Sequence, residues 1–159
     1  AVAADRSGGW VLGADTIVVL DDEVLGKPES PDAAVSMLQL LSGRSHEVIT
    51  GVAVIDPAGK SHTRHVSTSV IFRNLNDAEI AKYVATGSPL DKAGGYGIQD
   101  RSFSPVSSYD KCYLNVVGLP MCATGELLEL AGFSVPGDAA CPDHVGPRSP
   151  GAGGVRPLQ

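Results

Sequence analysis

The chain has 159 residues, a length that indicates one domain. Hydrophobic residues make up 43% of it, and no apolar run approaches the roughly 18 residues that span a bilayer. The formal net charge of −6 disfavours a protein that coats nucleic acid, although a few local cations or a metal could still attract a small anionic substrate. Three widely spaced cysteines without a CxxC pair, and no signal-peptide pattern, predict reduced thiols and a cytoplasmic protein.

The first part of the chain predicts two strands and a helix. Residues 10–20 are rich in β-branched side chains and predict a buried strand, which a turn connects to a return strand over 23–26. Ser30 is a natural N-cap before Pro31, and apolar residues at helical spacing predict a helix that stops at Gly43.

A hairpin and a second helix are expected next. Strands over 48–55 and 61–72 flank the turn Asp56-Pro57-Ala58-Gly59. Asn76 is the expected start of the helix, because Glu79 stands where a capping box requires it.

The remainder predicts a glycine-rich loop over 88–105, a strand over 113–119 and a third helix that Pro120 opens and Gly132 closes. Because aromatic residues make up only 5% of the chain, valine, leucine, isoleucine and alanine are expected to fill the core.

The composition changes near the end of the chain. Ten of the 26 residues in 134–159 are glycine or proline and none is aromatic. Such a segment buries too little apolar surface to offset chain entropy, so we expect a domain over 1–133 and a disordered tail over 134–159.

Asp15 is the first residue that suggests chemistry, because a carboxylate inside an apolar strand needs a compensating partner. Lys27 is a candidate partner: a two-residue turn would place it opposite Thr16, and a three-residue turn opposite Asp15. A structural aspartate bonded to backbone amides, and an exposed edge lysine, are the alternatives.

The segment 91–100 is the second candidate. Lys92 precedes the glycines Gly94 and Gly95, which would allow the backbone to approach an anion closely, and Gln99 could hydrogen-bond a base through its amide. An ordinary glycine-rich turn with a surface glutamine would show the same pattern.

The histidines offer weaker signals. His62 and His65 are three residues apart on a predicted strand, so they face opposite sides and do not suit one metal ion. His46 is expected to cap or pack near the first helix.

Five stretches, in order from about Leu12 to Phe133, together resemble the Maf nucleoside triphosphate pyrophosphatases. They are Gly13-Ala14-Asp15-Thr16; Leu25-Gly26-Lys27-Pro28; the stretch from Met37 through Leu41-Ser42-Gly43-Arg44 and His46-Glu47-Val48 to Thr50-Gly51-Val52; Asp91 through Gln99; and Asn115-Val116-Val117-Gly118-Leu119-Pro120.

The resemblance implies an α/β fold with a long mixed sheet, flanking helices and a cleft between two lobes, often as a homodimer. It also implies hydrolysis of dTTP and UTP to the monophosphate and pyrophosphate with a divalent metal, Mg²⁺ or Mn²⁺. By resemblance, Asp15 activates water and lies near the metal, Lys27 and Lys92 neutralise phosphate oxygens, and Thr16 and Gln99 set the base preference.

Some features depart from the family pattern. No S-x-x-R loop precedes the first strand, so the chain is expected to lack the N-terminal part of the domain; Ser88 replaces the usual glutamate, and Asp100 the usual glycine. The alternatives to a pyrimidine triphosphatase are the same chemistry on a modified or purine triphosphate, and a catalytically impaired nucleotide-binding or interaction protein.

Overall fold

The computed structural model describes residues 8–135 and the backbone of 156–157. One sheet has the strand order β2-β1-β3-β4-β5-β6, and every strand pair in the described part is antiparallel, where the resemblance implied a mixed sheet. The strands are β1 (Val11–Leu20), β2 (Glu23–Leu25), β3 (Ser45–Ile55), β4 (Ser61–Phe72), β5 (Val106–Tyr109) and β6 (Arg156–Pro157). The α/β class is confirmed.

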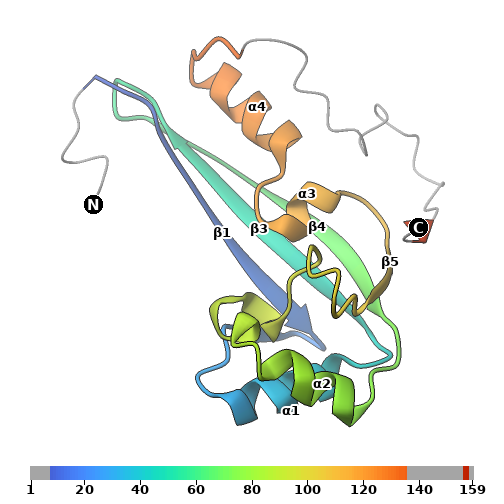
Figure 1. Ribbon diagram of the computed structural model, residues 1–159. Coiled ribbons are helices and arrows are strands. Elements are labelled where there is room, and N and C mark those ends of the chain that lie inside the picture. The colour runs from blue at the N-terminus through green and yellow to red at the C-terminus, as the bar shows by residue number, and fades with distance from the viewer. Residues whose placement is uncertain (1–7, 136–155, 158–159) are drawn as a thin grey trace.

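The helices occupy the two ends and the middle of this sheet. They are α1 (Pro31–Leu41), α2 (Asp77–Val84), α3 (Tyr113–Val117) and α4 (Met121–Leu130), with two 3₁₀ turns, η2 (Ser88–Asp91) and η3 (Ala93–Gly95). Figure 1 shows α1 and α2 side by side at one end of the long strands, α4 near the other end and α3 between them. No helix in this part of the chain is long and apolar enough to cross a membrane.

The predicted helix boundaries are confirmed. The Ser30 side chain accepts a hydrogen bond from the Ala33 amide, with Pro31 in the first turn. Asn76 and Glu79 form the complete capping box at the start of α2. These local hydrogen bonds satisfy amides that a helix start otherwise leaves unpaired.

The predicted strand over 113–119 is wrong. Residues 113–117 form the short helix α3, which Gly118 ends at a positive φ of 116°. The helix turns Asn115 into the core, where its Nδ2 donates to Val48 O at 2.9 Å and to Thr68 Oγ1 at 3.0 Å. On its other side from β3, β4 pairs with β5, a stretch for which the sequence had predicted no element.

Even-numbered residues of β3 face the core along the whole strand. On β3, Val48, Thr50, Val52 and Val54 are all buried, as the two-residue period of a strand requires. Two apolar clusters result: a large one beneath α1 and α2, and a small one in which Leu127 of α4 and Ala131, directly after it, pack on Val52 and Val54.

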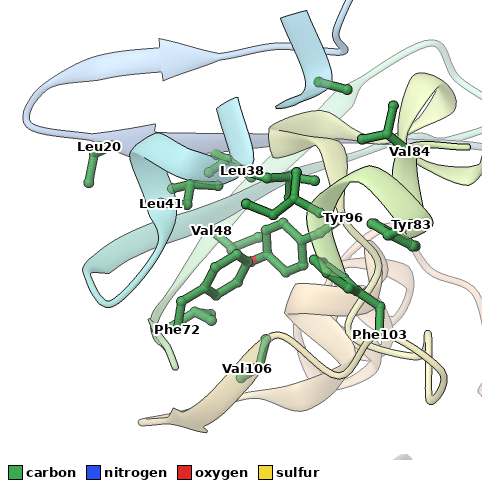
Figure 2. Packing of buried hydrophobic residues seen from close by; sticks show 14 residues of the cluster. Leu20, Leu38, Leu41, Val48, Phe72, Tyr83, Val84, Tyr96, Phe103 and Val106 are labelled. Carbon is green, nitrogen blue, oxygen red and sulfur yellow. The ribbon is translucent and has the colours of Figure 1, made fainter. Parts of the chain in front are cut away.

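Valine, leucine, isoleucine and alanine make up most of the large cluster, as expected, and four aromatic side chains pack together among them. Figure 2 shows the rings of Phe72, Tyr83, Tyr96 and Phe103 gathered below Leu38. Tyr83 stacks on Phe103 with ring centroids 4.0 Å apart, and Tyr96 meets Phe72 edge-on at 4.6 Å. Four of the eight aromatic residues of the chain are therefore buried together in this one cluster.

The predicted tail over 134–159 lies mostly outside the described residues. Only 134–135 and the backbone of 156–157 belong to the described part, and the latter pairs with β5.

Candidate active site

A cavity of about 350 Å³ lies on the core-facing side of the sheet. Strand β1, the segment after β2, the 91–100 loop and α3 all contribute to its walls. It brings together five of the residues singled out in the sequence, namely Asp15, Thr16, Lys27, Lys92 and Gln99. Residues that are up to 84 positions apart, from Asp15 to Gln99, therefore share one site.

The turn between β1 and β2 decides where Lys27 lies. Asp21 and Asp22 adopt positive φ values of 50° and 66°, and Leu20 pairs with Glu23, so the loop has two residues. Val18 pairs with Leu25, and continuing this register places Lys27 opposite Thr16. The two-residue alternative is the one that the structure adopts.

Asp15 is exposed, so the expectation of a buried carboxylate is wrong. The outer half of β1 has exposed residues on both faces, and β2 pairs only with positions 18–20. Asp15 Oδ1 accepts a hydrogen bond from the Thr16 amide at 2.9 Å. Asp15 also lines a second hollow of about 600 Å³ with Gly51, its partner on β3, and with His65, the partner of Gly51 on β4, so it is open to solvent and to a ligand.

Thr16 presents a hydroxyl with a defined orientation. Thr50 Oγ1 donates its only hydrogen to Asn115 O at 3.0 Å, and Thr16 Oγ1 lies 2.9 Å from Thr50 Oγ1. Thr16 must therefore be the donor in that pair, since a hydroxyl has one hydrogen. The lone pairs of Thr16 Oγ1 are left to accept a hydrogen bond at the cavity.

Lys92 belongs to the 91–100 loop, which forms another wall of the same cavity. Its Nζ donates to Ser88 O at 2.9 Å, to Ser88 Oγ at 3.1 Å and to Asp91 Oδ1 at 2.7 Å. The hydrogen bond from Lys92 lowers the pKa of the Asp91 carboxyl, with smaller help from the charge of Lys27. Asp91 is thus ionised beside both lysines, at the edge of the cavity.

The model of the family described as Maf-like protein matches residues 1–131. The chain belongs to the Maf family. The relatives include a dTTP/UTP pyrophosphatase of Moorella thermoacetica, 53% identical over 136 residues, which are 85% of this chain and 70% of that protein. Another, from Thermomicrobium roseum, bears the same name and is 50% identical over 134 residues, or 84% of this chain and 61% of that protein. The chain thus spans about two thirds of the length of these relatives.

Two residues expected to hold phosphate in this Maf protein do not line the cavity. Gly94 and Gly95 are buried, and their amides donate to Gly26 O and Lys92 O, each at 3.0 Å. Both adopt a φ of +71°, and a Cβ on Gly94 would lie 2.9 Å from Val18 Cγ2. Here the glycines allow the loop to pack closely on β1, and their amides are not available to an anion.

The sequence did not single out Tyr83, Ser88 and Asp100 as site residues of this Maf protein, although they surround Lys92. Asp100 lines the cavity and accepts hydrogen bonds from the side chains of Tyr83 and Ser88. The only sequence feature that pointed to Ser88 and Asp100 was their departure from the family pattern.

No histidine in the described part of the chain lines the cavity that holds Thr16, Lys27 and Lys92, although His65 borders the second hollow. His62 Nε2 is 3.3 Å from Asp56 Oδ2, and His46 is buried with its Nε2 2.7 Å from Tyr96 OH. Burial lowers the pKa of His46 to about 4, so the ring is neutral near pH 7. His46 is therefore a packing residue, as one of the sequence expectations had it.

A preformed metal cage is not found: within the described part of the chain, no three His, Cys, Asp or Glu side chains gather at metal-binding distance. Asp15 nevertheless suits a shared cation. Its Oδ1 accepts from the Thr16 amide, and Asp15 is exposed and is among the residues that line the cavity with Lys27 and Lys92. Mg²⁺ is commonly bound by one or two carboxylates together with the phosphates of a substrate.

Proposed function

We propose that this chain hydrolyses a nucleoside triphosphate, preferentially dTTP or UTP, to the monophosphate and pyrophosphate. The observation that carries the proposal is the single cavity that holds Asp15, Lys27, Lys92 and Gln99. Membership of the Maf family and relatives named dTTP/UTP pyrophosphatase support the same activity.

The lysines and the carboxylate divide the work of phosphoanhydride cleavage. Such a reaction needs positioning and charge stabilisation more than covalent chemistry. Lys27 and Lys92 neutralise phosphate oxygens from two walls of the cavity. Asp15 takes the proton from the water that attacks the α-phosphorus, the bond from that phosphorus to the bridging oxygen breaks, and pyrophosphate leaves.

A divalent cation, Mg²⁺ or Mn²⁺, held by Asp15 and the substrate phosphates, would supply further charge neutralisation. No other described carboxylate is needed for this binding mode. The role of Asp15 as a base depends on its exposure and on its place at the cavity, both of which the fold provides.

The hydrogen-bonding groups favour a uracil or thymine ring. Thr16 Oγ1 offers only lone pairs to the cavity, and the N3–H of these bases is a donor. The exposed Gln99 amide on the facing loop can donate through its NH₂ group to O2 or O4, the carbonyls on either side of N3. Cytosine, whose N3 is an acceptor, does not match Thr16.

The test is the release of pyrophosphate from dTTP, UTP and GTP with Mg²⁺ or Mn²⁺. Asp15→Asn should lower kcat by about 10²–10⁴-fold, the usual cost of losing a general base. Asp22→Asn is the matched control, since Asp22 lies in the β1–β2 turn outside the cavity and asparagine tolerates its positive φ. Binding of dTTP by the unmodified chain without any release of pyrophosphate would identify a nucleotide-binding protein and contradict the proposal.

A further inference from the structure

Asp100 is the meeting point of two hydrogen-bond chains beside the cavity. Its Oδ2 accepts from Tyr83 OH and, at 3.3 Å, from Ser88 Oγ. Asp100 lines the cavity together with Lys92 and Gly97. The carboxylate therefore connects α2 and η2 to the loop that carries Lys92.

The direction of the first hydrogen-bond chain follows from whether each group can donate or accept a hydrogen. The Lys92 ammonium can only donate, and it donates to Ser88 Oγ at 3.1 Å. The Asp100 Oδ2 oxygen accepts from Ser88 Oγ, so the single hydrogen of Ser88 points to Asp100. The order is Lys92 to Ser88 to Asp100, and the carboxylate fixes the rotation of the serine hydroxyl.

The second hydrogen-bond chain holds the Asp100 carboxylate in place. The Gly97 amide donates to Tyr83 OH at 3.3 Å, which leaves the tyrosine hydrogen for Asp100. Burial, with the hydrogen bond to Asp100, raises the pKa of Tyr83, so the tyrosine remains a neutral donor. The side chain of Asp100 thus has a partner on a packed helix and does not depend on Lys92 for its position.

The space around Gly97 shows how closely these groups fit. A Cβ at Gly97 would lie 3.0 Å from Lys92 Cε and 3.2 Å from Asp100 Oδ2. The stem of Lys92 therefore passes over Gly97, next to the carboxylate, and its charged end is confined by Ser88 and Asp91.

We propose that Asp100 is a positioning residue, which acts through Ser88 to hold the Lys92 ammonium where it neutralises substrate phosphate. The inference rests on the proposed function for the role of Lys92. Without the carboxylate, Ser88 loses the acceptor that orients it, and the ammonium keeps only Ser88 O and the exposed Asp91 as firm partners. Lys92 then moves toward Asp91, away from a fixed place at the cavity.

The first experiment is a double-mutant cycle on kcat/KM for dTTP with the full chain. Asp100→Ala and Ser88→Ala should each lower kcat/KM by about 10- to 100-fold, the equivalent of losing a hydrogen bond to a charged group. In a Lys92→Ala background the same changes should have less than about a twofold effect, because coupled residues are not additive. Asp100→Asn, which keeps an acceptor oxygen, should recover part of the loss.

A matched control and a fold check accompany the cycle. Asp32→Ala removes an exposed carboxylate at the start of α1, away from the cavity, and should leave kcat/KM unchanged. If Asp100→Ala does not fold, Asp100→Asn and Ser88→Ala complete the cycle. If the variants lower kcat/KM equally in the presence and absence of Lys92, Asp100 has a merely structural role and the inference is overturned.

A second readout does not depend on activity. The ammonium signals of the five lysines are recorded by ¹H–¹⁵N NMR without nucleotide, and Lys92→Arg assigns the one that belongs to Lys92. Asp100→Ala and Ser88→Ala should shift the Lys92 signal and speed its hydrogen exchange, while the Lys60 signal stays in place. An unchanged Lys92 signal overturns the inference. A changed signal in a chain that releases no pyrophosphate supports the positioning role and refutes the proposed function alone.

Discussion

Acid should destabilise this protein through His46, and the effect can be worked out from the structure. The His46 side chain is 3% exposed, packs edge-on against Phe72 and Tyr96, and hydrogen-bonds Tyr96 OH through Nε2. Its Nδ1 is buried without a hydrogen-bond partner. A charged ring in this place would lack solvent and a counter-ion, and burial accordingly lowers the pKa of His46 from 6.5 to about 4.

The direction in which pH changes the free energy of unfolding follows from proton uptake. Between pH 6.5 and about 4 the unfolded chain binds a proton at His46 that the folded chain does not bind, so the free energy of unfolding falls as the pH falls. One pKa unit corresponds to about 1.4 kcal/mol, so the loss between pH 7.5 and 4.5 is about 2.5 kcal/mol, and it levels off near 3 kcal/mol below pH 4.

The measurement compares the unmodified chain with His46→Gln, which cannot titrate but can still hydrogen-bond Tyr96. Urea unfolding at a series of pH values gives the free energy of unfolding for both. The difference between the two curves isolates His46, since every other titrating group is common to them. The unmodified chain should lose about 2.5 kcal/mol more than the variant between pH 7.5 and 4.5. Parallel curves over this interval would refute the reasoning.

Two further predictions concern the loop that faces β1. Gly94→Ala should lower the free energy of unfolding by about 2–4 kcal/mol in urea, because a φ of +71° is strained for alanine and the new Cβ would lie 2.9 Å from Val18 Cγ2. A loss below 1 kcal/mol would mean that the loop adjusts without difficulty. Gln99→Ala should reduce the ratio of kcat/KM for dTTP to that for GTP by roughly tenfold, and lower the dTTP value itself by less. Equal losses on both nucleotides would make Gln99 a structural residue.

The elements predicted well are those whose signals are local. The N-cap at Ser30, the capping box of Asn76 with Glu79, and the hairpin around Asp56 depend on residues within a few positions of each other. Side-chain hydrogen bonds to nearby amides determine them, so a short stretch of sequence contains the whole cause.

The failures arise where distant contacts decide the structure. The stretch 113–119 has the composition of a strand, yet Asn115 must reach Val48 O and Thr68 Oγ1, and a helical turn places it there. Asp15 was expected to be buried because its neighbours along the chain are apolar. Burial depends instead on what packs against each face of the sheet, which the neighbours along the chain do not show.

The candidate site, too, was predicted where local sequence decides and missed where distant contacts decide. Periodicity and motif spacing indicated Asp15, Lys27 and Lys92, and the fold places all three at one cavity. The sequence could not show that the amides of Gly94 and Gly95 are used within the fold, or that Asp100 orients Ser88. Both facts depend on distances between side chains and backbone that no residue pattern contains.

The buried Thr50 offers a last test of how the core governs the site. Thr50 Oγ1 accepts from Thr16 and donates to Asn115 O, so it fixes Thr16 as an acceptor toward the cavity. Thr50→Val removes this acceptor, and the Thr16 hydroxyl is then free to donate its hydrogen to a ligand. Since N3 of cytosine is an acceptor and N3–H of thymine is a donor, the ratio of kcat/KM for dTTP to that for dCTP should fall by roughly tenfold. Thr68→Val is the matched control: it disturbs the same buried Asn115 without contacting Thr16, and should cost stability while leaving the ratio unchanged. If Thr50→Val lowers both rates equally, or if Thr68→Val changes the ratio as much, then the orientation of Thr16 does not select the base.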